Sequence, residues 1–423
     1  MQGMTSNIST SPIERSSACR LWLALVSLVQ PVLAPFLLSR LCVLVTAIFL
    51  EWLVDSGRAF RYEFIGQAPL ATLSATFDAN WYSDIALHGY SASPDIAIQQ
   101  NYHFFPLFPL LMRVFGTILG LSGVPGGFNL AGVIVNHVLF LGCLALLYRL
   151  TLTQWGDAKF AKYTVWAMAF LPWSFEFSMA YSESAYLFTS LAAITLACHG
   201  QLKGGAGYII SVGLLSALAA LTRPQGLTIA LTIALLLIIS HEGVSLYKRT
   251  RNVVLVLSPT VIALVGFAVY IAINTGNPWA VLQSGRPWGQ GWLQDIGRIF
   301  LLPPENPFWI VDIVSALGLV VWIGLFFALI AMFLSRTSHW MAPRPLKLLL
   351  VGYSVVYFLL TIVTAPANGS WGRYMVVVFP CIWVVAAVAQ RITKRTSAKL
   401  LLVTAVALQT LLFSAAIILQ VTP

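Results

Sequence analysis

Residues whose side chains could carry acid–base chemistry gather in ATFDANWYSDIALHGYS, which covers residues 75–91. If this segment is helical, Asp84 and His88 lie on one polar stripe, one turn apart. Asp78 lies instead in the sector of Trp81. A carboxylate on the apolar side of a helix is costly unless it is paired or used. Asp78 is therefore a candidate general base for a reaction that removes a proton.

Each of these residues also has a purely structural interpretation. Asp78 could be the N-cap of the helix, because aspartate is a favoured N-cap residue. Asp84 and His88 could form a solvated polar stripe with Asn80. Residue types and spacing alone leave the structural and the functional interpretation of Asp78 open.

Four further motifs place ionisable residues near the ends of apolar segments. They are NYHFFPLFPLLMR with His103, SFEFSMAYSESAY with Glu176 and Glu183, TRPQG with Arg223, and NGSWGRYMVVVFP with Arg373. A tryptophan-rich stretch, residues 274–310, adds Arg286, Trp288, Trp292 and Arg298. A guanidinium group can hold a phosphate through its planar fork of donors.

These motifs have structural alternatives as well. The aromatic and proline residues around His103 could form a belt at the membrane interface. Ser182 or Ser184 could cap the helix that follows. An arginine near the end of a span could extend its head group to the interface.

The composition shows what kind of chain must position these residues. The chain has 423 residues, of which 59% are hydrophobic and 9% charged, whereas soluble domains carry about 25% charged residues. The apolar residues form repeated blocks of roughly 17 to 25 residues, the length of a membrane-spanning helix. The net charge of +10 comes from short basic clusters between these blocks, and not from the continuous basic face that a nucleic-acid site needs. The sequence predicts an integral membrane protein with many spans, and no nucleic-acid partner.

We expect eleven spans in an all-α bundle, with the N-terminus in the cytoplasm and the C-terminus outside. The expected spans are 33–53, 127–148, 161–176, 183–199, 207–222, 226–241, 252–273, 311–334, 346–364, 373–390 and 400–420. Residues 1–20 are polar and are expected to be a disordered cytoplasmic tail. Residues 21–423 are expected to form one transmembrane domain.

The apolar segment 103–121 decides the topology. If it lies in the plane of the outer interface, all seven lysines of the chain fall on the cytoplasmic side, as the positive-inside rule requires. If it spans, the lysines after it lie outside. We therefore expect an in-plane helix. The acids and several arginines then face the outside, where segments 54–126 and 274–310 form the active-site face.

Motif searches exclude several other chemistries. The five cysteines include no CxxC pair, so neither a disulfide framework nor a thiolate metal site is indicated. The sequence contains no glycine-rich nucleotide loop, HExxH or GxSxG. An external site could not use cytosolic nucleotide sugars. The first apolar segment has no clear cleavage site and is expected to be an uncleaved anchor.

The order of the motifs resembles a known family. FDANWYSDIALHGY, HFFPLFPLLMR, AYSESAYLF, TRPQG and GRYMVVVFP occur in this order between about residues 35 and 390. Together they resemble the bacterial relatives of GPI mannosyltransferase II, the PIG-V-like enzymes of the GT-C superfamily of membrane glycosyltransferases. The resemblance implies transfer of a sugar, typically mannose, from a polyprenyl-phosphate donor to a lipid or glycan acceptor. It also implies juxtamembrane helices in the first external loop and an acidic residue that serves the reaction.

Under this resemblance, the candidate residues take specific roles. Asp78 matches the acidic residue and would take the proton of the acceptor hydroxyl in an inverting displacement. The expected phosphate ligands are Arg223, Arg373 and Arg286, and the expected sugar-stacking residues are Trp81, Tyr82, Trp288 and Trp292. Further substrate contacts are expected from Asp84, His103, Glu176 and Glu183. We expect no metal and no other cofactor, because the arginines can supply the positive charge. The resemblance favours the plasma membrane of a prokaryote, with the site on the extracytoplasmic side.

Two other functions remain alternatives. A transporter or flippase of lipid-linked glycans would place ionisable groups near the middle of the bilayer, and only Arg40 lies clearly deep in an expected span. The chain could also be a non-catalytic subunit of a membrane glycosyltransferase. The many acids and arginines in the external segments count against this alternative.

Overall fold

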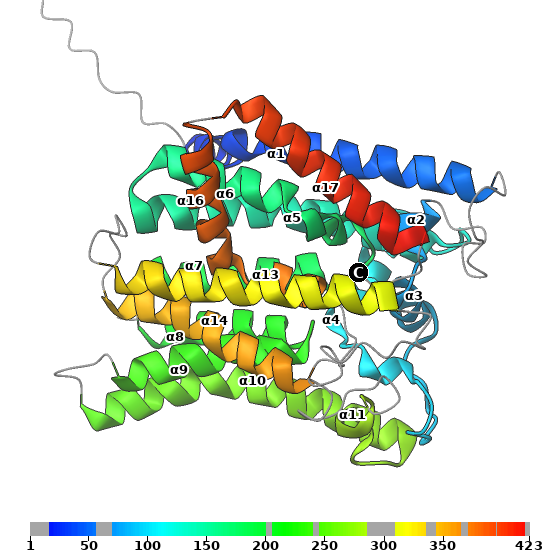
Figure 1. The fold of residues 1–423 in the computed structure, drawn as a ribbon. Coiled ribbons are helices and arrows are strands. Elements are labelled where there is room, and N and C mark those ends of the chain that lie inside the picture. Colours follow the sequence, from blue (N-terminus) through cyan, green and yellow to red (C-terminus); the bar gives the residue numbers. More distant parts are fainter. Residues whose placement is uncertain are drawn as a thin grey trace, which may run out of the picture.

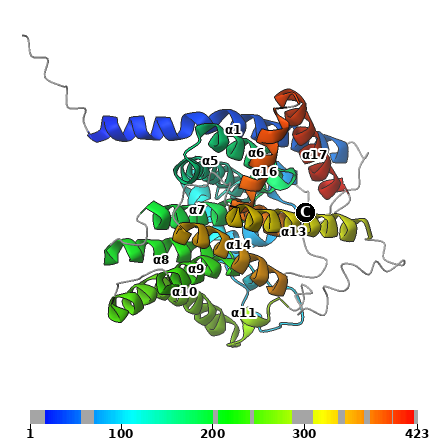
Figure 2. The ribbon, with the colours of Figure 1, turned by 60° about the vertical axis from the view of Figure 1, so that its left-hand side comes forward.

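The computed structural model describes residues 17–55, 70–199, 205–239, 245–285, 309–335, 344–364, 371–394 and 396–418. Throughout these ranges the regular structure is helical, with no strand. Figure 1 shows a bundle whose long helices run roughly side by side, and Figure 2 shows α1 along one side and α10 with α11 along the other. The regular structure of the described residues is thus all helical, which confirms the all-α prediction.

The long helices connect in alternating directions. They are α1 (Ser17–Asp55), α5 (Gly127–Trp155), α6 (Ala158–Phe170), α7 (Glu183–His199), α8 (Ala206–Ala220), α9 (Leu227–Ile239), α10 (Leu246–Thr275), α13 (Trp309–Leu334), α14 (Arg344–Thr364), α16 (Ile382–Ile392) and α17 (Ala398–Ile418). The shorter elements are α2 (Ala71–Ser74), α3 (Asp78–His88), α4 (Leu107–Ile118), α11 (Ala280–Gln283) and α15 (Trp371–Val376). Among the described residues, four connections contain short 3-10 helices: η1 (Asn101–His103), η2 (Pro172–Ser178), η3 (Pro224–Gly226) and η6 (Phe379–Cys381).

Among the described residues, six helices are long and apolar enough to cross a membrane. They lie in α1, α5, α10, α13, α14 and α17. Further apolar helices of 10–17 residues include 206–220, 224–239 and 379–392. The total of eleven spans stays a prediction. Helix α1 begins at Ser17, and residues 1–16 of the expected tail lie outside the described residues.

The segment expected to lie in the membrane plane does not cross the bundle. α4 has 12 residues, whereas crossing the hydrocarbon layer takes about 20. Its first amide, Leu107 N–H, donates to the carbonyl of Leu221 at the end of α8 (2.8 Å). α1 ends and α5 begins at the same end of the bundle (Figure 1). α4 therefore adds no crossing between them, and the direction of the later helices is unchanged.

Two expected spans have a different form from the one predicted. The span expected at 161–176 ends at Phe170, because Pro172 follows and the residue before a proline disfavours the helical conformation. The span expected at 373–390 is interrupted between α15 and α16, next to Pro380. Both interruptions bring short, non-α segments to the same end of the bundle.

The lysines lie at the opposite end. Five lysines lie at or near the start of a helix: Lys159 and Lys162 in α6, Lys248 in α10, Lys347 in α14 and Lys399 in α17. Lys394 lies just after the end of α16. Lys203 lies outside the described residues. One end of the bundle therefore carries the lysines, and the other carries α2, α3, α4 and the interrupted segments. We call these the lysine end and the site end.

Candidate active site

The site end is centred on an ion pair between two residues predicted from separate motifs. Arg373 Nη1 lies 2.6 Å from Asp78 Oδ2. The Arg373 side chain is 3% exposed and that of Asp78 is 21% exposed. The N-cap of α3 is Phe77, and Asp78 is the first helical residue, without a capping role for its side chain. The N-cap interpretation of Asp78 is therefore wrong, because the carboxylate turns to Arg373 instead.

Arg373 is shared among several side chains. Its Nε donates to Glu183 Oε1, and Glu176 Oε2 lies 4.0 Å from the same nitrogen. The ring of Tyr181 packs against the guanidinium carbon, with 4.1 Å between that carbon and the ring centroid. This cation–π contact stabilises the charge and fixes the plane of the guanidinium.

A second arginine joins the cluster through Glu183. Arg223 Nη2 donates to Glu183 Oε1, and its Nε donates to the hydroxyl of Ser182 (3.0 Å). The Tyr82 hydroxyl donates to the same Ser182 oxygen (2.9 Å). We use the name acid–arginine cluster for five residues: Asp78, Glu176, Glu183, Arg223 and Arg373. The structure thus brings together five of the residues predicted from sequence, with Tyr82 beside them.

The acid–arginine cluster keeps unused hydrogen-bonding capacity. Glu176, Glu183, Arg223 and Arg373 are buried, yet within the described part of the chain Arg223 Nη1, Glu183 Oε2 and both oxygens of Glu176 have no hydrogen-bond partner. Buried polar atoms are satisfied in most native structures, so each of these exceptions calls for an explanation. Burial raises the pKa of the Glu176 carboxyl well above its ordinary value, although Arg373 opposes this shift. A ligand with both acceptor and donor groups would satisfy these atoms.

The backbone before Asp78 is held in an unusual conformation. Phe77 has φ 49° and ψ −122°, a region that non-glycine residues rarely adopt and that is typical of functional sites. The preceding helix α2 fixes this turn. Glu51 Oε1 accepts hydrogen bonds from the amide and the hydroxyl of Thr72 (2.9 and 2.7 Å), and Asn129 Nδ2 donates to the carbonyl of Ser74 (2.8 Å).

Arg40 positions the segment that carries Glu176. It is buried in α1 and donates to Ser174 O (2.9 Å), Ser174 Oγ (2.8 Å) and Ser178 Oγ (2.8 Å). Its guanidinium also packs on Phe140, 4.6 Å from the ring centroid. In the sequence, Arg40 is an isolated charge deep in an expected span. Such a residue is expected to have a polar partner inside the bundle. Because its hydrogen bonds hold η2 in place, Arg40 gives no support to a transport pathway.

Asn136 of α5 positions the Tyr181 segment in a similar way. Its amide nitrogen donates to the carbonyls of Met179 and Tyr181, and Ala180 N–H donates to the carbonyl of Leu73 (2.8 Å). These bonds join α2, α5 and the connection before α7 into one support under the cluster. No sequence motif indicated the role of Asn136.

Two glycines let the arginines approach. A side chain at Gly226 would collide with the backbone of Ala219 and Ala220, and one at Gly372 would collide with the indole of Trp173. Gly226 closes the tight turn that follows Arg223, and Gly372 immediately precedes Arg373. Close packing therefore explains Gly226 of TRPQG and Gly372 of NGSWGRYMVVVFP.

Other predicted residues lie outside the cluster. Asp84 accepts from Asn101 Nδ2 (2.8 Å) and lies 2.9 Å from the ring nitrogen of His88. Its side chain is 45% exposed, as the solvated-stripe alternative predicts. Trp81 stacks on Phe104, with 5.9 Å between ring centroids. Arg286, Trp288, Trp292 and Arg298 lie outside the described residues.

His103 lies near the cluster but has a different partner. Its Nδ1 is 3.2 Å from the hydroxyl of Ser284, which follows α11. Burial lowers the pKa of His103 to about 4, while Asp78 acts in the opposite direction. His103 is therefore neutral at physiological pH, and its contact with Ser284 links the first loop to the end of α11.

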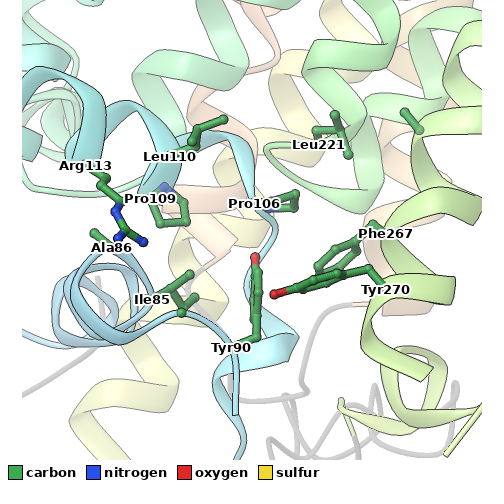
Figure 3. Close-up of a pocket in the computed structure, with 12 residues that line it drawn as sticks. Ile85, Ala86, Tyr90, Pro106, Pro109, Leu110, Arg113, Leu221, Phe267 and Tyr270 are labelled. Atoms are coloured by element: carbon green, nitrogen blue, oxygen red, sulfur yellow. The ribbon is translucent and has the colours of Figure 1, made fainter. Parts of the chain in front are cut away.

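A cavity of about 400 Å³ lies behind α3. Its lining is mostly apolar and comes from α3, α4, the end of α8 and α10, as Figure 3 shows. Arg113 and the two tyrosines Tyr90 and Tyr270 are the polar residues on its wall. Leu221, which also lines it, lies two residues before Arg223, so the cavity adjoins the cluster.

With this geometry established, comparison with known proteins identifies the family. The sequence model of the family described as Mannosyltransferase (PIG-V) matches residues 23–280, more than half of the chain. The chain belongs to the PIG-V mannosyltransferase family. The match includes Asp78, Glu176, Glu183 and Arg223, whereas Arg373 lies beyond it. The family resemblance predicted from the motifs is confirmed.

Solved structures agree with this assignment at the level of the fold. ArnT from Cupriavidus metallidurans bound to undecaprenyl phosphate matches with a TM-score of 0.50 and 18% identity, over 77% of this chain and 58% of that one. The oligosaccharyltransferase AglB from Archaeoglobus fulgidus, in complex with an inhibitory peptide and a dolichol-phosphate, matches with a TM-score of 0.50 and 13% identity, over 89% and 55%. This PIG-V family member thus has the fold of GT-C glycosyltransferases, and spans little more than half the length of these two. No curated protein matches the chain.

Proposed function

We propose that this protein is a membrane glycosyltransferase that moves a sugar, mannose, from a polyprenyl-phosphate donor to a hydroxyl of a lipid or glycan acceptor. The observation that carries the proposal is the contact between Asp78 and Arg373 in a buried acid–arginine cluster. A partly exposed carboxylate and two buried guanidinium groups are the parts that this reaction needs. Membership of the PIG-V family supports the choice of mannose.

The arginines would receive the leaving phosphate. When the bond between the sugar and the phosphate breaks, the phosphate gains negative charge, and fixed cationic donors stabilise that charge best where water is excluded. Arg223 and Arg373 are both buried and share Glu183. Within the described residues, Arg223 Nη1 has no other partner, so it can donate to a phosphate oxygen without breaking an existing bond.

Asp78 would serve as the general base. It is the most exposed acid of the cluster, so an acceptor can reach it from the site end. In the step we propose, the acceptor oxygen attacks the anomeric carbon while the carbon–oxygen bond to the phosphate breaks. The hydroxyl proton passes to Asp78, and the polyprenyl phosphate leaves with the bonding electrons. A single displacement of this kind inverts the anomeric centre.

The cavity of Figure 3 would hold part of the donor's polyprenyl chain. Its apolar walls suit a hydrocarbon chain, and one wall is α10, which exposes Val261, Ile262, Val265 and Val269 on its outer side. A chain in this cavity would lead from the lipid along Leu221 towards Arg223. Arg113 would interact with anionic groups at the mouth of the cavity.

The lysines support an extracytoplasmic site, and the motif resemblance to bacterial enzymes is the reason for proposing the plasma membrane of a prokaryote. All six described lysines lie at the end opposite the acid–arginine cluster. Lysine-rich ends face the cytoplasm, so the cluster would face outside. There, a lipid-linked donor is available where nucleotide sugars are not.

A transfer assay tests the proposal. Purified protein in detergent is given polyprenyl-phosphate mannose labelled in the sugar, together with a panel of lipid and glycan acceptors. We expect label in an acceptor product and a loss of about 10²- to 10⁴-fold in rate for Asp78→Asn, since that is the usual contribution of a general base. The control is Asp95→Asn, which changes an exposed acid of the same loop. Full transfer by folded Asp78→Asn would remove Asp78 as the base, and equal loss in the control would show a nonspecific effect.

A further inference from the structure

A second cavity opens at the lysine end, and its lining residues differ from those of the acid–arginine cluster. Its volume is about 520 Å³, and α6, α16 and α17 line it. In Figure 1, α6 and α16 lie on the left, and α17 begins near the top of α16 and runs towards the right. Tyr163 and Thr393 join α6 to α16 through a 2.6 Å contact between their hydroxyls, and Gln409 of α17 donates to the carbonyls of Ala169 and Leu171. The cavity is therefore a groove between helices that polar contacts hold together.

The groove has a charged mouth and an apolar interior. Lys159, Lys162 and Lys399 line it at the start of α6 and α17. Further in, its walls include Trp166, Phe170 and Leu408. None of the three lysines forms an ion pair with an acid in the ranges that the structure describes. The positive charge at the mouth is thus available to an anion.

The length of the groove fits one leaflet. The lining residues of α6 extend from Lys159 to Phe170, which corresponds to about 16 Å along a helix that rises 1.5 Å per residue. Half of a hydrocarbon layer of roughly 30 Å is about 15 Å. A lipid whose phosphate lies at the lysines would therefore place its acyl chain between the helices and end it near the middle of the bilayer.

We propose that this groove is a binding site for an anionic phospholipid of the leaflet at the lysine end. Basic pockets between membrane helices bind anionic lipid head groups in this way. The three lysines contact the phosphate, and the aromatic and aliphatic walls contact one acyl chain. The groove lining extends only to Pro172 and Leu408, so a longer polyprenyl chain would not fit within it. The site is separate from the acid–arginine cluster, so it does not depend on the proposed glycosyl transfer.

Native mass spectrometry tests the site. The full-length protein is reconstituted in nanodiscs of phosphatidylcholine alone, or with phosphatidylglycerol or undecaprenyl phosphate added. The protein is then released from the nanodiscs in the mass spectrometer, and the lipids that stay bound to it are counted. We expect one phosphatidylglycerol to be retained in preference to phosphatidylcholine. A lysine near a membrane surface contributes about fivefold to anionic lipid binding, so K159Q/K162Q/K399Q should weaken retention by roughly 100-fold at low salt.

Two further variants separate charge from shape. The charge-matched control R149Q/K248Q/R251Q removes three basic residues of the same end that do not line the groove, and it should retain the lipid. Ala405→Phe fills the groove without changing charge and should release the lipid while circular dichroism stays unchanged. The proposal is overturned if phosphatidylcholine or undecaprenyl phosphate is retained equally well. It is also overturned if the lysine variant and its control lose lipid to the same extent.

Discussion

The guanidinium of Arg373 and the carboxylate of Asp78 lie 2.6 Å apart, although one follows α14 and the other begins the third helix of the chain. Under the proposed function, this contact places the base and the phosphate receptor in direct competition. When the phosphate of the polyprenyl-phosphate sugar binds Arg373, it takes over an N–H group that now contacts Asp78. The carboxylate is then free to accept the proton of the acceptor hydroxyl. Binding of the donor would thus prepare the base, which favours donor binding before acceptor binding.

Replacement of Arg373 by lysine tests this coupling. Arg373→Lys keeps the charge but loses the fork that contacts Asp78 and Glu183 together. We expect kcat to fall by about 10²- to 10³-fold, as when a transition-state donor is removed, with kcat/KM falling equally. The measurement is steady-state transfer with a varied donor concentration. A change in KM alone would show that Arg373 contributes only ground-state binding; Arg149→Lys at the lysine end is the matched control.

Glu183 and Glu176 should differ sharply in stability measurements, although both are buried acids. Glu183 holds both arginines, and removal of one partner from a buried ion pair costs about 3–5 kcal/mol. Glu183→Gln should therefore lower the thermal midpoint strongly. The carboxylate of Glu176 has no hydrogen-bond partner among the described residues, so Glu176→Gln should cost little.

The pH dependence of the Glu176 variant has a definite sign. Because burial raises the pKa of the folded Glu176 carboxyl above 4.5, its unfolded value, folding favours the protonated form. The wild type should then lose stability relative to Glu176→Gln as pH rises from 4.5 through the raised pKa. Thermal midpoints of both proteins across this range give the difference. A constant difference would contradict the raised pKa.

The sequence was sufficient to predict the helical bundle and most members of the cluster. Hydrophobic blocks set the helices, and Asp78, Glu176, Glu183, Arg223 and Arg373 stood out because ionisable residues beside apolar segments are rare. Their pairing could not be predicted, because it depends on how α3, α7 and α15 pack. Asp84 shows the limit most clearly: its type and position matched a site residue, but Asn101 and His88 hold it away from the cluster.

The supporting residues were harder to predict because their partners are mostly backbone atoms. Asn136 donates to two carbonyls, and Gly372 matters through the indole that packs against it. Neither leaves a spacing pattern in the sequence. The interruption at Pro380 was also missed, since hydropathy alone made residues 373–390 a continuous span.

Arg40 should act on the site through structure alone. Arg40→Met keeps much of the apolar stem but leaves the hydroxyls and carbonyl of Ser174 and Ser178 without their donor. Loss of a charged partner from buried acceptors costs about 1–3 kcal/mol, so the thermal midpoint should fall. We expect transfer activity to fall with it, and hydrogen exchange in residues 172–178 to rise. Reduced activity without faster exchange there would contradict a positioning role.

The cavity behind α3 gives a prediction that depends on the length of the lipid chain. Ala263 lines this cavity on α10, and Ala263→Trp would fill part of its 400 Å³. If a polyprenyl chain occupies this space, KM should rise by about tenfold or more for a long-chain donor, since several buried methylenes at about 0.8 kcal/mol each are displaced. A donor with only two isoprene units should be affected little. Ile262→Trp, at a neighbouring position that is 69% exposed and outside the lining, is the control. Equal KM values of Ala263→Trp and wild type for the long donor would place the chain elsewhere, whereas a loss with both donors would indicate damage to the site itself.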